Sequence, residues 1–92
     1  MSMTPVLIKS SGVQQCIKPS NGEHFSLKEL QDYVGGYIEV VRLKNDRLMI
    51  VDEEGKCKNK PINLTASLVL FSENRCDRIV GDVVLCDRKY IL

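Results

Sequence analysis

The chain has 92 residues, of which 43% are hydrophobic, and its 13 basic and 12 acidic residues leave a formal net charge of +1. This length supports one hydrophobic core and excludes a second domain, while the hydrophobic fraction excludes wholesale disorder. The near-neutral balance disfavours a nucleic-acid binder, because such proteins usually carry a clear basic excess. No apolar run approaches the roughly 20 residues of a membrane helix, and the N-terminus lacks a signal-peptide pattern. We therefore expect a cytoplasmic protein.

The first elements along the chain are two predicted strands. The segments PVLIKS (5–10) and VQQCIKP (13–19) flank a Ser-Ser-Gly turn signal at 10–12, a pattern typical of an antiparallel hairpin. Proline, asparagine and glycine at 19–22 then end the second strand.

A helix is predicted to follow this hairpin. Ser26 is a good N-cap, and Glu29 lies three residues later in capping-box position. One apolar stripe recurs at helical spacing, formed by Leu27, Leu30 and Val34. Gly35 and Gly36 come next, where a left-handed C-cap favours glycine, so we expect the helix to end there and the chain to reverse.

A second hairpin is predicted from the strands 37–43 and 48–52, with a reversal at 44–47. Glu39 interrupts the first of these strands, and the alternation of side chains places it on the more open face of the sheet. The acidic segment 52–56 is predicted to be a solvated turn, in which Gly55 supplies a positive φ angle.

The last third predicts a helix and a final strand. Asn63 stands at the N-cap position of a helix over 64–71, whose predicted apolar stripe is Leu64, Leu68 and Phe71. A loop over 72–78 leads into a strand over 79–87. The order ββ-α-ββ-α-β indicates a single α+β domain over residues 1–92, with two helices packed on a mainly antiparallel sheet of about five strands.

The cysteines give no sign of a metal centre or of catalysis. They are widely spread, no C-x-x-C pair occurs, and His24 is the single histidine, so free and mostly structural thiols are expected at Cys16, Cys57, Cys76 and Cys86. A Cys16–His24 nucleophilic pair would need an orienting third group, which the pattern does not supply. Glycine-rich phosphate loops are absent as well. The sequence predicts neither catalytic residues nor a cofactor.

Three blocks together resemble a known family: LQDYVGGYIEVVRL (30–43), MIVDEEGKCKNKPINLTAS (49–67) and IVGDVVL (79–85). In order and spacing they are similar to DUF3846, a family of small domains of unknown function carried by phages, plasmids and other bacterial mobile elements. The resemblance covers residues 27–85, and the loop KCKNK (56–60) and the tail CDRKYIL (86–92) depart from the shared pattern. It implies a genomic setting and supplies no reaction or ligand.

These observations favour a small non-catalytic binding protein of phage or mobile-element type, acting stoichiometrically on a host protein or a small ligand. A nucleic-acid accessory factor using the cations at 44–47 and 56–60 is the alternative, followed by a small enzyme. A homodimer is also expected, because a small domain built from hairpins has sheet edges to protect.

If a ligand site exists, its predicted centre is Asn63, with Glu39, Glu53 and Gly55 close to the same helix end. Polar groups that converge at the start of a helix are able to hold a ligand. On this hypothesis Asn63→Asp keeps the cap and the melting temperature but loses the ligand, because aspartate lacks the amide donors.

Overall fold

The computed structural model describes residues 4–91 and confirms the predicted α+β fold and order of elements. The strands and helices are β1 (Val6–Ile8), β2 (Gln14–Cys16), α1 (Leu27–Val34), β3 (Ile38–Arg42), β4 (Arg47–Asp52), α2 (Leu64–Ser72) and β5 (Val83–Asp87), followed by the 3-10 turn η1 (Arg88–Tyr90). The final strand is shorter than predicted, because Gly81 adopts a φ of 76° just before it and interrupts the extended chain.

The strands form one antiparallel sheet in the order β2-β1-β5-β4-β3. Each predicted hairpin is present, and β5 joins the two by pairing with β1 on one side and β4 on the other. The central position of β5 explains why its residues are apolar on both faces. The edges of the sheet are the three-residue strand β2 and the longer strand β3.

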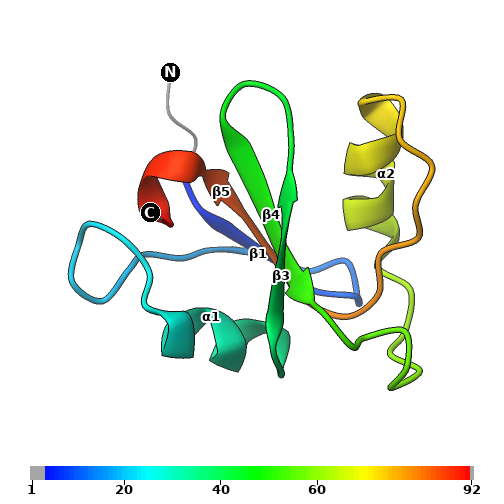
Figure 1. Cartoon of the computed structure of the whole chain (residues 1–92), viewed down its shortest axis with the longest axis horizontal. Helices are drawn as coiled ribbons and strands as arrows, with labels where there is room; N and C mark the ends of the chain where they lie inside the picture. Colours follow the sequence, from blue (N-terminus) through cyan, green and yellow to red (C-terminus); the bar gives the residue numbers. More distant parts are fainter. Residues whose placement is uncertain (1–3, 92) are drawn as a thin grey trace.

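The two helices lie on opposite faces of this sheet (Figure 1). Leu30 and Val34 of α1 pack on one face, which the sheet supplies with residues such as Ile50 and Val84. The residues that alternate with these along β4 and β5, such as Met49 and Val83, point to the other face of the sheet. They pack there against Ala66 and Leu70 of α2. Because strand side chains alternate, every residue of β4 and β5 that reaches either face meets a covering layer. The domain is therefore a three-layer arrangement with two small cores.

Helix α1 begins and ends as its sequence predicts. The Ser26 side chain accepts a hydrogen bond from the Glu29 N–H, and the Glu29 carboxylate accepts one from the Ser26 N–H, which completes the capping box. Gly35 closes the helix with φ 82°, in the left-handed region where a side chain is strained. Leu27 differs from the prediction, because it lies at the first turn and is exposed instead of joining the buried stripe.

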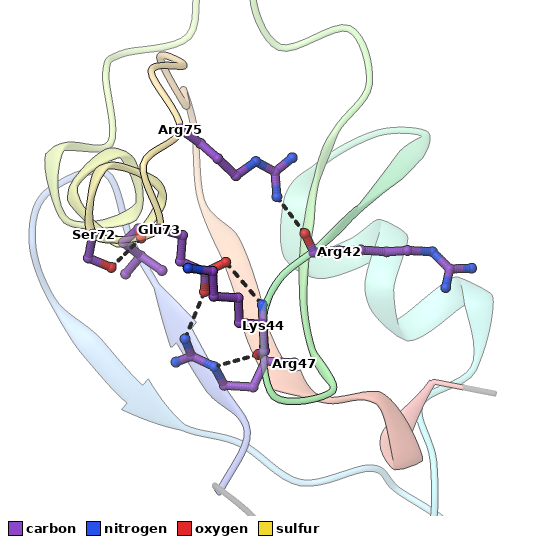
Figure 2. Close-up of polar contacts among 7 residues, drawn as sticks. Arg42, Lys44, Arg47, Ser72, Glu73 and Arg75 are labelled. Atoms are coloured by element: carbon purple, nitrogen blue, oxygen red, sulfur yellow. Dashed lines mark hydrogen bonds and ion pairs between the residues drawn. The ribbon is translucent and has the colours of Figure 1, made fainter.

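The C-terminal end of α2 is fastened to the β3–β4 turn (Figure 2). The buried carboxylate of Glu73 accepts hydrogen bonds from the backbone N–H of Lys44 and from Nη2 of Arg47, each at 3.0 Å. The Arg75 guanidinium donates to the backbone carbonyl of Arg42 on β3. These contacts hold the helix beside the hairpin and fix which of its faces points outward.

Candidate functional site

Asn63 is the predicted site residue whose environment is most fully defined. Its side-chain oxygen accepts a hydrogen bond from the Ala66 N–H at 3.0 Å, so the predicted N-cap is confirmed. Its amide nitrogen donates to the backbone carbonyls of Ile8 at 2.9 Å and Gly81 at 2.8 Å. The residue is completely buried. Asn63 therefore joins three segments of backbone, and both its amide hydrogens are already used within the protein.

Two of the other three predicted site residues line one depression of the surface. Glu39 and Glu53 line a shallow depression of about 120 Å³, whose walls also include Lys56 and Arg78. Neither Asn63 nor Gly55 lines it. The structure thus brings Glu39 and Glu53 together in a place of mixed charge. The segment 79–80 also lines this depression and contacts both Asn63, whose N–H donates to the Ile79 carbonyl, and Gly55.

Gly55 is required for a different reason from the predicted one. It does not belong to the glycines with positive φ, and it is buried against Val80 in the segment before β5. A Cβ atom at this position would lie 2.9 Å from Cγ2 of Val80, closer than real Cβ contacts. The prediction of a positive φ was wrong, because close packing and not turn geometry selects glycine here.

The acidic turn is also not fully solvated. The Asp52 side chain is buried, and its carboxylate pairs with Lys60 at 2.6 Å and Lys58 at 3.0 Å. Burial raises the pKa of this carboxyl. Hydrogen bonds from the two lysines and from the Glu54 N–H lower the pKa by more than burial raises it, so it lies below its ordinary value. The prediction of a solvated turn was therefore wrong at Asp52 and holds for the exposed Glu53 and Glu54.

The same two lysines bind the end of helix α1. Lys60 Nζ donates to the carbonyl of Val34 at 2.7 Å, and Lys58 Nζ donates to the carbonyl of Gly35 at 3.3 Å. Carbonyls at a helix C-terminus lack partners in their own helix and attract cations. The loop 56–60 therefore ties α1 to β4.

The largest departure from the sequence prediction is the outer face of α2. Its predicted core stripe is exposed, and the helix buries Ala66 and Leu70 instead. Together with Ile62, which precedes the helix, the stripe forms a surface that we call the α2 apolar face: Ile62, Leu64, Leu68 and Phe71. Each of these side chains exposes between 52% and 66% of its surface.

The α2 apolar face is continuous and has a basic margin. Leu64, Leu68 and Phe71 follow the spacing i, i+4, i+7 and so lie on one side of the helix. A groove of about 450 Å³ runs beside Leu68 and Phe71, and the loop residues Arg75 and Arg78 also line it. Large contiguous apolar patches of this kind mark interaction surfaces on soluble domains.

Within residues 4–91 the thiols and carboxylates form no metal centre. No group of three or more His, Cys, Asp or Glu side chains is placed to hold an ion. All four cysteines are free, and burial raises the pKa of the Cys86 thiol to about 12, which makes it unreactive. Cys16 lies exposed on the edge strand β2.

The cations considered for nucleic-acid binding are largely neutralised by neighbouring acids. Lys58 and Lys60 pair with Asp52. Further ion pairs join Lys56 to Asp77 and Arg47 to Glu73, each at 3.0 Å. Neither helix in the described part of the chain has the length and apolar character needed to cross a lipid bilayer.

Comparison with known families matches residues 3–90 to the family described as "Domain of unknown function (DUF3846)". The match extends beyond residues 27–85 at both ends and spans the loop 56–60 and most of the tail. Searches of the curated proteins and of the solved structures gave no match. Because the family model spans nearly the whole chain, the protein belongs to the DUF3846 family.

Proposed function

We propose that this protein is a non-catalytic binding protein that engages a partner protein in stoichiometric complex through the α2 apolar face. The observation that carries the proposal is the exposure of Leu64, Leu68 and Phe71 on a helix that contains no charged residue, together with that of Ile62 just before it. A cytoplasmic role in a bacterial host, for a protein of phage or mobile-element type, fits the family resemblance.

The chemistry of this surface favours a particular kind of partner. An apolar stripe at i, i+4 and i+7 suits an amphipathic helix laid against it, with apolar side chains entering the groove beside Leu68 and Phe71. Arg75 and Arg78 border the groove together with Asp77, whose charge is paired with Lys56. The two arginines therefore favour acidic residues at the margin of the partner segment. The partner is therefore expected to present an apolar helix with acidic flanks.

A protein partner agrees better with this surface than the other classes do. The apolar side chains are open to solvent over more than half of their surface, whereas small-molecule sites enclose most of the ligand. The ion-paired lysines of the loop 56–60 lend no support to phosphate binding. No constellation of nucleophile, base and orienting group accompanies the surface.

Leu68→Glu is expected to abolish partner recovery, because it places a charge in the middle of the apolar contact. Leu27→Glu is the matched control, since Leu27 is 58% exposed on α1, on the other face of the sheet. Tagged wild type, Leu68→Glu and Leu27→Glu are used for capture from bacterial host lysate, and the recovered protein is remixed with each purified variant.

The proposal predicts a 1:1 complex with wild type and with Leu27→Glu, and at least a tenfold weaker one with Leu68→Glu. Equal binding by all three proteins, or recovery of nucleic acid alone, would overturn it.

Self-association through the edge of the sheet is a separate prediction. Strand β3 is the longer of the two edges, and pairing it with a second copy satisfies its outward backbone groups. Light scattering at tens of micromolar should give twice the 10.4 kDa chain mass for both wild type and Leu68→Glu. A monomeric wild type contradicts the dimer. If wild type has the mass of a dimer and Leu68→Glu has the mass of a single chain, the second copy binds the α2 apolar face instead.

A further inference from the structure

A second groove lies on the opposite face of the sheet, at the turn end of the β3–β4 hairpin. It has a volume of about 510 Å³ and is lined by Val40 and Arg42 of β3, Leu48 of β4, and Arg88 and Ile91 of the C-terminal segment. Leu48 belongs to the core under α1, which places the groove on the α1 side of the sheet. It is thus distinct from the α2 apolar face.

The groove is open because α1 is short and is held at the other end of the hairpin. Asp52 pairs with Ile38 across the β3–β4 ladder, and the lysines bound to Asp52 hold the end of α1 there. A helix of eight residues spans only about 12 Å, less than the length of the ladder. At the far end Arg42 lies opposite Leu48, and η1 covers the sheet only partly. Val40 consequently stays 42% exposed.

Two guanidinium groups border this apolar floor, and no carboxylate of residues 4–91 lines the groove. Figure 2 shows the Arg42 side chain extending away from the Glu73 cluster, while its backbone carbonyl accepts from Arg75. Arg88 enters through η1, and its backbone N–H donates to the carbonyl of Asp46. None of the ion pairs found within residues 4–91 involves the guanidinium of Arg42 or Arg88.

We propose that this groove, the β3–η1 groove, binds a small amphiphilic anion, whose acidic group lies between Arg42 and Arg88 and whose apolar part rests on Val40, Leu48 and Ile91. Its volume lies within the roughly 300–1,000 Å³ of small-molecule sites. Two like charges on one groove repel each other until an anion lies between them, and arginine suits carboxylate, sulfonate and phosphate oxygens through paired N–H donors. The apolar floor selects against a bare inorganic ion, because only a ligand with an apolar body covers it.

The probe for this site is 8-anilinonaphthalene-1-sulfonate, which combines a sulfonate with an aromatic body and fluoresces when its surroundings are apolar. Wild type is expected to bind one equivalent. Arg42→Gln and Arg88→Gln are each expected to weaken binding about tenfold or more, because each removes one charged hydrogen-bond donor group. The neutral analogue N-phenyl-1-naphthylamine should bind wild type with a similarly reduced affinity.

Two further variants separate this groove from the α2 apolar face. Val40→Trp fills the groove from an exposed strand position that tolerates aromatic residues, and it should block the probe. Leu68→Glu should leave probe binding unchanged, whatever the outcome of partner capture. The inference is overturned if folded wild type does not bind the probe, if the arginine variants bind it equally well, or if Leu68→Glu removes the binding.

Discussion

Asn63→Asp is expected to destabilise the fold by about 3–5 kcal/mol, even though aspartate is as good an N-cap as asparagine. The substitution removes the two N–H donors that bind the carbonyls of Ile8 and Gly81, and it puts a carboxylate oxygen where an amide stood, 2.8–2.9 Å from those oxygens. Both carbonyls then lose a buried partner, and the new charge is buried without a cation. Sequence reasoning alone predicts a near-native melting temperature for this variant, and the buried amide reverses that expectation.

The melting temperature measured by circular dichroism tests this expectation. A loss of 3 kcal/mol lowers it by roughly 12–24 °C in a domain of this size. Asn21→Asp is the matched control, because the exposed Asn21 only accepts hydrogen bonds, from the N–H groups of Glu23 and His24, and aspartate accepts them equally well. A melting temperature of Asn63→Asp close to that of Asn21→Asp would contradict the assigned role of the Asn63 amide.

Asp52→Asn is expected to cost about 2–3 kcal/mol, somewhat less than a fully buried ion pair, since Lys58 and Lys60 are partly exposed and regain some hydration. The asparagine oxygen still accepts from the Glu54 N–H, so the loss reports mainly on the two lysine contacts. Urea unfolding gives the free energy directly. Asp77→Asn is the control, because its pair with Lys56 is more than half exposed and should contribute less than about 1 kcal/mol.

The ion pairs of Asp52 with Lys58 and Lys60 also predict how the stability of the protein depends on pH. Because the pKa of Asp52 is lower in the folded state than the unfolded value of about 3.9, its contribution is complete well above that pH and is lost as pH falls through the folded-state pKa. The unfolding free energy of wild type should thus be nearly constant between about pH 7 and 5 and should decrease below about pH 4. Asp52→Asn should show a smaller decrease. An equally steep acid loss in both proteins would assign the effect to other carboxylates.

Local patterns predicted the elements of the fold because each of those signals acts over a few residues. Ser26 and Glu29 satisfy each other's backbone within one helical turn, and Gly35 ends the helix through its own φ. Residues 48–51 are apolar on both sides, a pattern typical of a covered strand, and β4 lies inside the sheet with a helix layer on each face.

The orientation of α2 was not predictable in the same way, because its sequence LTASLVLFS is apolar on more than one side. Leu64, Leu68 and Phe71 form a stripe as regular as the buried pair Ala66 and Leu70, and helical periodicity does not distinguish the two. The contacts of both helix ends determine which stripe is buried. Asn63 binds the start of α2 to β1, and Glu73 binds its end to the β3–β4 turn. These contacts connect residues far apart in the chain.

Long-range contacts also explain the corrections at the predicted site. The partner of the Asn63 amide at Ile8 lies 55 residues away, and no local motif indicates that pairing. The burial of Asp52 depends on lysines that fold back from the following loop. The capping role of Asn63 was predictable from its position before α2, whereas its full burial depended on how the sheet and the helix meet.

The most direct test of the α2 apolar face as a binding surface is photocrosslinking from that face inside bacterial cells that produce the protein. Phe71→benzoylphenylalanine places the reactive group on the face, and Leu27→benzoylphenylalanine places it on α1 with similar exposure. After illumination, mass spectrometry of the tagged protein should reveal a 1:1 adduct with one partner protein from position 71 and none from position 27. No adduct at position 71, or adducts only between two copies of this chain, would contradict the account.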